Sequence, residues 1–228
     1  MNEGDALLAA VLAEPLDDTP RLVYADWLDE HGQPERAEFI RVQVELARHP
    51  TLALQSREIA LFFLHGDRWL APLKAPGRPL DGESHGAFRR GFVEIVWMTA
   101  TRFLERAAAL FASAPVRELR VTRTTRDDLT RLLASPFLAR LDCLDLSDRR
   151  LGDPAVFGVA GAETVRGLRS LRLRGCGFTH SGAMALANSP FLSGLRFLDV
   201  SHNALSPVAV SALRQRFGEG VIAEGTTR

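Results

Sequence analysis

The hydrophobic residues of the C-terminal half recur at a fixed interval, with polar residues between them. The clearest copies are Leu-Arg-Ser-Leu-Arg-Leu from Leu168 and Leu-Arg-Phe-Leu-Asp-Val from Leu195, which lie 27 residues apart. One interval before Leu168, the copy Leu-Asp-Cys-Leu-Asp-Leu begins at Leu141. Repetition at a fixed period of roughly 20–50 residues is typical of solenoids, in which each repeat is one supersecondary unit.

Two less regular copies precede these three. Leu119 in Val-Arg-Glu-Leu-Arg-Val lies 25 residues before Leu144, and Val93 in Gly-Phe-Val-Glu-Ile-Val lies 26 residues before Leu119. The segments between the predicted strands repeat as well, since Ser-Pro-Phe-Leu occurs at 135–138 and again at 189–192. The pattern therefore predicts five strand-and-helix units, more than the roughly three that a solenoid needs for stability.

The periodicity also predicts how these units pack. Side chains alternate faces along a strand, so the leucines of each copy point to one side. A single unit cannot bury that side alone, whereas parallel stacking of neighbours closes one continuous core between sheet and helices. We expect an α/β solenoid, a short horseshoe with a parallel sheet on its concave face and helices outside. Helical segments cap both ends, and residues 220–225 are a candidate final edge strand.

The first 50 residues predict three short helices. Thr19-Pro20 is typical of a helix start, with threonine as the N-cap and proline in the first turn. Gly32 is a natural helix end, and Pro34 opens the next helix. We expect three domains: a helical domain at 1–50, a helix and loop that connect or cap at 51–90, and the repeat domain at 91–228.

These patterns resemble two known families. The Leu-x-x-Leu-x-Leu copies are similar to leucine-rich repeats of the longer, ribonuclease-inhibitor-like kind. The segment Tyr24–Leu28, with Gly32 and Glu38–Ile40, resembles a small repeat-companion domain found at the N-terminus of many planctomycete and myxobacterial proteins. The first resemblance implies a solenoid that binds partners on its concave face, and the second implies a bacterial source but no particular reaction.

Charge and composition restrict the partner and the compartment. Lysine plus arginine and aspartate plus glutamate number 28 each, so the whole chain has no net charge to attract nucleic acid or an anionic membrane. Neither is expected as a partner, although five arginines cluster between Arg117 and Arg131. The start of the chain has no signal-peptide pattern, and no apolar run approaches the roughly 18 residues of a membrane span. We expect a cytoplasmic protein.

The residues between the leucines are the candidate binding residues. Aligned units give a middle row whose charges alternate in sign, and neighbouring residues of this row are expected to form cross-strand ion pairs. Such a self-neutralising row either stabilises the strand register or forms part of a binding surface. Aromatic residues and arginine are favoured at interface hot spots. The candidate protein-binding residues are Phe92, Glu94, Glu118, Arg120, Asp145, Arg172, Arg174, Phe197 and Asp199.

Motifs for catalysis, cofactor binding and metal binding are not found in the sequence. It has no Walker loop, no His-Glu-x-x-His, no Cys-x-x-Cys and no nucleophile elbow, and Cys176 and Asn203 fall at a turn-stabilising position of the repeat. We therefore expect no enzyme activity, no cofactor and no metal. The leading hypothesis is a non-catalytic module that binds a protein partner. The alternatives are a regulator of an enzyme such as a nuclease or GTPase, and an enzyme with a site in the 73–90 loop.

Overall fold

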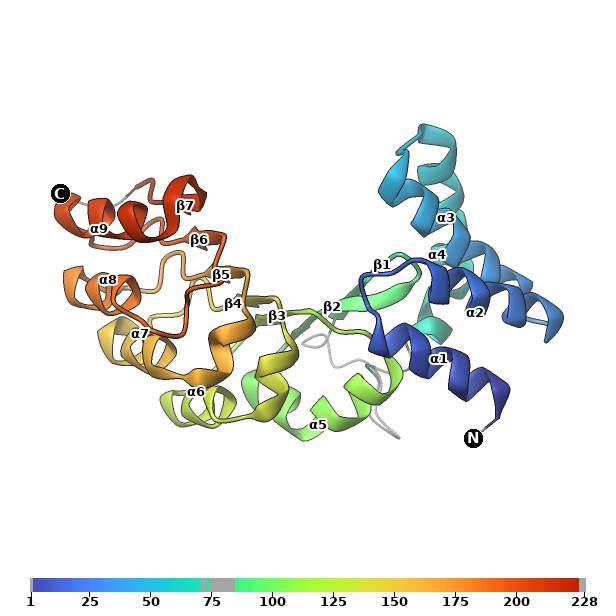
Figure 1. Cartoon of the computed structure of the whole chain (residues 1–228), viewed down its shortest axis with the longest axis horizontal. Coiled ribbons are helices and arrows are strands. Elements are labelled where there is room, and N and C mark those ends of the chain that lie inside the picture. The colour runs from blue at the N-terminus through green and yellow to red at the C-terminus, as the bar shows by residue number, and fades with distance from the viewer. Residues whose placement is uncertain (1, 71–72, 74–84, 226–228) are drawn as a thin grey trace. The chain divides into compact units, whose positions relative to one another are not determined.

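A computed structural model describes residues 2–70, 73 and 85–225 (Figure 1). The described strands form one seven-stranded sheet in which each strand pairs with its neighbours in chain order, from β1 to β7. The chain divides into two compact units. Unit 1 comprises residues 1–96 and 108–116, and unit 2 comprises residues 97–107 and 117–228. The boundary between the two units therefore falls inside the second strand.

Unit 1 begins with the helices that the sequence predicted. The Asn2 side chain accepts a hydrogen bond from the Asp5 backbone N–H, and the Asp5 carboxylate accepts one from the Asn2 backbone N–H. The two bonds form a capping box at the first helix. Gly32 has a φ of 72°, the left-handed conformation that ends a helix, and Pro34 starts the next one. The elements are α1 (Glu3–Ala13), α2 (Thr19–Glu30), α3 (Pro34–Arg48), α4 (Leu52–Trp69), β1 (His85–Arg89) and β2 (Phe92–Met98).

The core of unit 1 joins the helices to the second strand. Phe92 of β2 packs in one buried cluster with residues from α1, α2 and α3, among them Val11, Leu28 and Ile40. Partly buried Tyr24 and Trp27 pack against this cluster. The aromatic residues of the Tyr24–Leu28 segment therefore stabilise the helical core.

A hairpin replaces part of the expected loop. β1 and β2 are joined by Arg90 and Gly91, which have φ values of 49° and 86°, as a two-residue hairpin turn requires. A Cβ on Gly91 would come within 2.6 Å of the Ile40 Cα, so only glycine fits. The prediction of a loop over 73–90 is therefore wrong for residues 85–89, and residues 74–84 lie outside the described residues.

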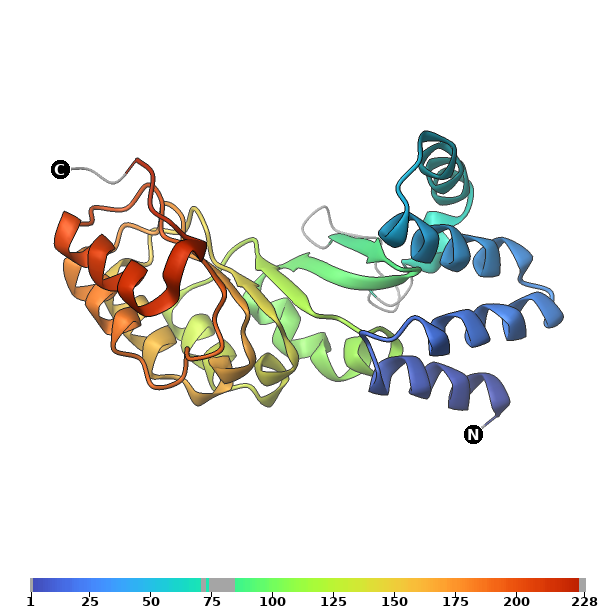
Figure 2. The ribbon, with the colours of Figure 1, turned by 45° about the horizontal axis from the view of Figure 1, so that its top comes forward.

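Unit 2 has the predicted strand register. Leu119, Leu144, Leu171 and Leu198 lie side by side on consecutive parallel strands, and each is fully buried. The strands are β3 (Glu118–Val121), β4 (Cys143–Asp145), β5 (Ser170–Arg172), β6 (Phe197–Asp199) and β7 (Val221–Ile222). The helices are α5 (Ala100–Ser113), which spans both units, α6 (Arg126–Leu133), α7 (Gly152–Gly161), α8 (His180–Ala187) and α9 (Pro207–Phe217). Short 3₁₀ helices lie at Pro136–Arg140, Glu163–Gly167 and Gly218–Gly220. Figures 1 and 2 show α6 to α9 side by side along one side of these strands.

The turns after the strands repeat along with the strands. The Asn203 amide donates to the carbonyls of Leu173, Val200 and Ser201 at 2.8–3.1 Å and accepts from the Gly177 backbone at 2.8 Å. The Cys176 thiol donates to the Leu146 carbonyl at 3.1 Å. The turn-stabilising role expected for both residues is confirmed.

Candidate functional site

The side of β3–β6 that faces away from the helices of unit 2 carries most of the predicted binding residues. We call this side the open face. Because side chains alternate along a strand, burial of the leucines against the helices places the residues between them on this side. The register aligns the middle row that the sequence predicted, Arg120–Asp145–Arg172–Asp199, and beside it a flanking row, Glu118–Cys143–Ser170–Phe197.

The charges of the open face do not form the predicted alternating ladder. Arg120 Nε donates to Glu118 Oε1 at 2.6 Å, and Arg172 Nη1 donates to the same oxygen at 3.0 Å. The expected Arg172–Asp145 pair is long, at 3.9 Å. Asp145 and Asp199 instead accept hydrogen bonds from the backbone N–H two residues later. A carboxylate of the flanking row therefore holds both arginines.

Each of these two arginines also lies over an aromatic ring. The Arg120 guanidinium carbon lies 4.9 Å from the centroid of the Trp97 ring, and that of Arg172 lies 5.7 Å from the centroid of the Phe197 ring. Their side chains remain 36% and 30% exposed. Burial alone would lower the pKa of Arg172, but the Glu118 carboxylate raises it, so this side chain stays cationic. The open face thus presents two oriented guanidinium groups beside aromatic rings.

Trp97 is the residue of this site that the sequence reasoning missed. It lies one position beyond Phe92–Val96, the strand segment that was aligned as the first repeat. The Thr122 N–H donates to the Met98 carbonyl at 2.9 Å, so the end of β2 pairs with β3 within unit 2. A large aromatic residue at the end of the first repeat was the available signal.

Three of the predicted binding residues are not accessible. Phe92, Glu94 and Glu118 are 4%, 3% and 4% exposed, so the prediction that they face solvent is wrong. Phe92 belongs to the helical core of unit 1, and Glu94 and Glu118 are buried as the counter-ions of arginines. Arg120, Asp145, Arg172, Phe197 and Asp199 are half-buried on the open face, and Arg174 is exposed just after β5.

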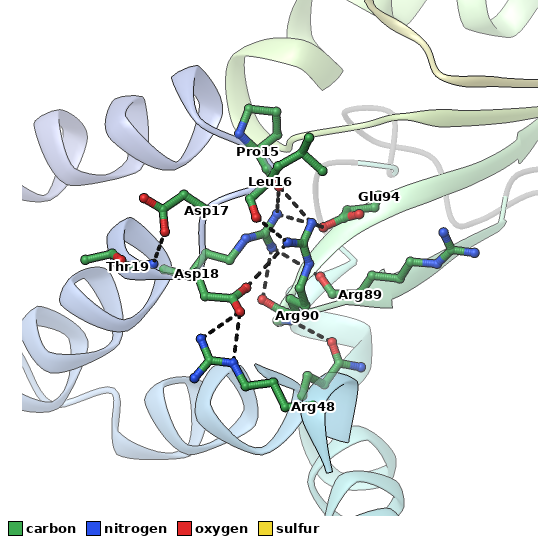
Figure 3. Close-up of polar contacts among 12 residues, drawn as sticks. Pro15, Leu16, Asp17, Asp18, Thr19, Arg48, Arg89, Arg90 and Glu94 are labelled. Carbon is green, nitrogen blue, oxygen red and sulfur yellow. Dashed lines mark hydrogen bonds and ion pairs between the residues drawn. The ribbon is translucent and has the colours of Figure 1, made fainter. Parts of the chain in front are cut away.

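Glu94 forms a buried ion cluster in unit 1. Its Oε1 accepts from Arg21 at 2.7 Å and from Arg90 at 3.0 Å. Figure 3 shows Arg90 between Glu94, Asp18 and the carbonyls of Pro15 and Leu16. Arg21 is fully buried, and burial lowers its pKa. These contacts tie the α1–α2 turn to the hairpin, so the cluster has a structural role.

Arg36 lies in the same unit without a carboxylate partner among the described residues. It donates to the Gly91 carbonyl at 2.5 Å, and burial lowers its pKa to about 10. Asp26 of α2 pairs with Arg41, at 2.7 Å, and not with Arg36. The rings that enclose the Arg36 guanidinium, with centroids at 5.1–5.7 Å, are those of Phe39, Trp69, Phe88 and Phe92.

A second surface feature lies on α4. Its Ile59, Phe63 and Leu64 side chains are 67%, 86% and 70% exposed. Next to them a pocket of about 390 Å³ is lined by apolar side chains, with Gln43 and Glu58 as its polar residues. The apolar lining residues include Phe39, Ile59, Phe62 and Phe88. The sequence identified α4 but not its exposure.

Both cysteines, Cys143 and Cys176, are free thiols and are buried. Burial raises the pKa of Cys143, and it raises that of Cys176 to about 12, so neither thiol ionises at neutral pH. Within the described ranges, His, Cys, Asp and Glu side chains nowhere gather in a group of three that could bind a metal ion. The helices of the same ranges are too short or too polar to traverse a lipid bilayer.

Comparison with known proteins gives one family. No curated protein and no solved structure matches the chain. The family model described as Leucine Rich repeat matches residues 168–187 and 195–213, which are β5 with α8 and β6 with α9. Leucine-rich repeats generally mediate protein–protein interaction. The chain therefore carries leucine-rich repeats over these two segments.

Proposed function

We propose that this protein is a non-catalytic module that binds a protein partner through the open face. The observation that carries the proposal is the pair of guanidinium groups held by one buried carboxylate, each against an aromatic ring. Arginine and aromatic side chains dominate binding energy at interfaces, and pre-organised side chains lose little conformational entropy on association. The contact residues of the proposal are Arg120, Asp145, Arg172, Arg174, Phe197 and Asp199.

We further infer that the repeats extend beyond the two matched segments as one solenoid of the ribonuclease-inhibitor-like kind. The continuous leucine register from β3 to β6 supports this inference. Residues 1–50 are then the repeat-companion domain, residues 51–90 the connection or cap, and residues 91–228 the repeat domain.

The test is affinity capture followed by paired substitutions. A partner captured by the full chain is expected to lose at least tenfold in affinity for Phe197→Ala and for Arg172→Ala, because both remove a hot-spot side chain. Phe157→Ala is the matched control, since Phe157 is 47% exposed on α7, on the helix side of the same unit. If both open-face variants bind as tightly as the Phe157→Ala variant, the partner does not bind this face.

A further inference from the structure

The net charge of the chain is zero because the two units carry net charges of equal size and opposite sign. Unit 2 holds 18 arginines against 12 aspartates and glutamates, a formal net charge of +6. Unit 1 holds 10 basic and 16 acidic residues, a formal net charge of −6. Neutrality of the whole chain therefore does not describe the surface that the repeat unit presents.

Part of the excess positive charge of unit 2 lies at the two ends of β5 and at the start of β6. Arg169 and Arg196 immediately precede β5 and β6, and Arg174 follows β5; all three are exposed. None of the three forms an ion pair with another described residue. Together with Arg172, which lies over the Phe197 ring, they form what we call the β5–β6 patch: Arg169, Arg172, Arg174, Arg196 and Phe197.

The strands before the patch carry opposite charges at the equivalent positions. Arg117 and Asp142 precede β3 and β4 at the equivalent positions, and they form an ion pair. Asp142, Arg169 and Arg196 are linked in series, because the Arg169 N–H donates to the Asp142 carbonyl and the Arg196 N–H to the Arg169 carbonyl, both at 2.8 Å. An acidic residue at 169 or 196 would continue the pairing. Two like charges on adjacent strands instead repel each other, at a cost to stability.

The chemistry of the patch selects its ligand. A guanidinium presents a planar fork of donors that matches a carboxylate in two parallel hydrogen bonds. Arg169 and Arg196 immediately precede neighbouring strands, which lie about 4.8 Å apart, so they suit carboxylates presented by one short segment. Phe197 adds an apolar contact beside them.

The same features are less suited to nucleic acid. Single-stranded nucleic acid needs a ring face on which a base can stack. The Phe197 ring already has the Arg172 guanidinium over it, so one face of the ring is not free for a base.

We propose that the β5–β6 patch docks an acidic protein segment, one that carries at least two carboxylates next to an apolar side chain. This inference rests on the proposed function and names the chemistry of the partner. Asp199 is the only acidic residue among the residues of β5 and β6, and it is already occupied by the Ser201 N–H and hydroxyl at 2.9 and 2.6 Å. The charge of the three unpaired arginines is therefore available to a ligand.

The experiment uses the full chain and a fluorescent peptide that alternates glutamate with phenylalanine, against the same peptide with glutamine for glutamate. The acidic peptide is expected to bind, and more weakly as salt rises. The Arg169→Glu/Arg196→Glu variant is expected to lose at least tenfold in affinity. Arg126→Glu/Arg214→Glu is the matched control, because it changes net charge equally at exposed sites on α6 and α9. The Arg169→Gln/Arg196→Gln variant removes the two charges without reversing them and should also weaken binding. Circular dichroism shows whether each variant is folded.

Other outcomes overturn the proposal. Equal loss in the two charge-reversal variants means that net charge alone attracts the peptide. Tighter binding of a single-stranded DNA oligonucleotide that depends on Arg169 and Arg196 assigns the patch to nucleic acid. Salt-sensitive self-association that the Arg169→Glu/Arg196→Glu variant abolishes assigns it to the acidic unit of a second copy. Loss of a captured partner in Phe197→Ala, without acidic-peptide binding, rejects the acidic chemistry but keeps the open face.

Discussion

Each unit contains a carboxylate oxygen that accepts hydrogen bonds from two arginines, but the arginines are enclosed in unit 1 and partly exposed in unit 2. In unit 1, Glu94 Oε1 accepts from Arg21 and Arg90, whose side chains are 0% and 16% exposed. In unit 2, Glu118 Oε1 accepts from Arg120 and Arg172, which are 36% and 30% exposed. A buried carboxylate that neutralises enclosed arginines stabilises a core. A buried carboxylate that binds partly exposed arginines fixes their orientation at the surface. The comparison separates a structural ion cluster from the surface that we propose binds a partner.

The units also differ in how their stability is distributed. Unit 1 depends on contacts that occur once, such as the Arg36 guanidinium among four aromatic rings. Unit 2 repeats its leucine contacts and turn hydrogen bonds from strand to strand, as solenoids do. Single substitutions in polar residues should therefore cost more in unit 1.

The largest expected effect is that of Glu94→Ala. Removing Glu94 leaves Arg21 buried without its carboxylate partner and leaves Arg90 with Asp18 alone. We expect the free energy of unfolding to fall by about 3–5 kcal/mol. Glu118→Ala should cost only about 1 kcal/mol, because Arg120 and Arg172 can reach water. Urea unfolding followed by tryptophan fluorescence measures both. Equal losses of stability in the two variants would show that the exposure of the arginines does not decide how much each carboxylate stabilises the protein.

The next effect tests the turn of the repeat. Asn203→Ala removes three donated hydrogen bonds and one accepted one at a buried site, and we expect a loss of about 2–3 kcal/mol. Cys176→Ala should cost less, since a thiol is a weak donor. Thermal unfolding of both variants gives the order. A larger loss for Cys176→Ala would mean that packing, not hydrogen bonding, maintains the turn.

The smallest effect concerns the link between neighbouring repeats and depends on pH. Burial opposes ionisation of Asp153, but hydrogen bonds from Thr179 and Gly182 at the start of α8 lower its pKa below the ordinary value. Its stabilising effect is therefore complete above the unfolded pKa of about 3.9 and is lost as pH falls through the lower folded pKa. Asp153→Asn should reduce stability by about 1 kcal/mol at pH 7, with the difference vanishing in acid. Urea unfolding of both proteins from pH 7 to pH 2.5 measures it, and a difference that persists at the lowest pH would contradict this role.

The strand register of unit 2 could be derived from the sequence because a fixed period aligns every unit at once. The predicted rows of the open face match the observed pairing from β3 to β6. The same reasoning failed at β2, where Phe92 and Glu94 have the alternation of a repeat strand but belong to the core and ion cluster of unit 1. Alternation identifies which residues share a side of a strand, and it contains no information about what covers that side.

The sequence alone determined the α/β repeat architecture of unit 2, the three N-terminal helices and the turn roles of Cys176 and Asn203, because these follow from local propensity and periodic spacing. Only the tertiary structure decided which charges pair. Arg21 and Glu94 are 73 residues apart, and Arg172 and Glu118 are 54 apart. A long flexible side chain reaches several positions on a neighbouring strand, and its partner is selected by burial and by the aromatic rings around it. Charge pairing therefore depends on packing, which spacing along the chain does not specify.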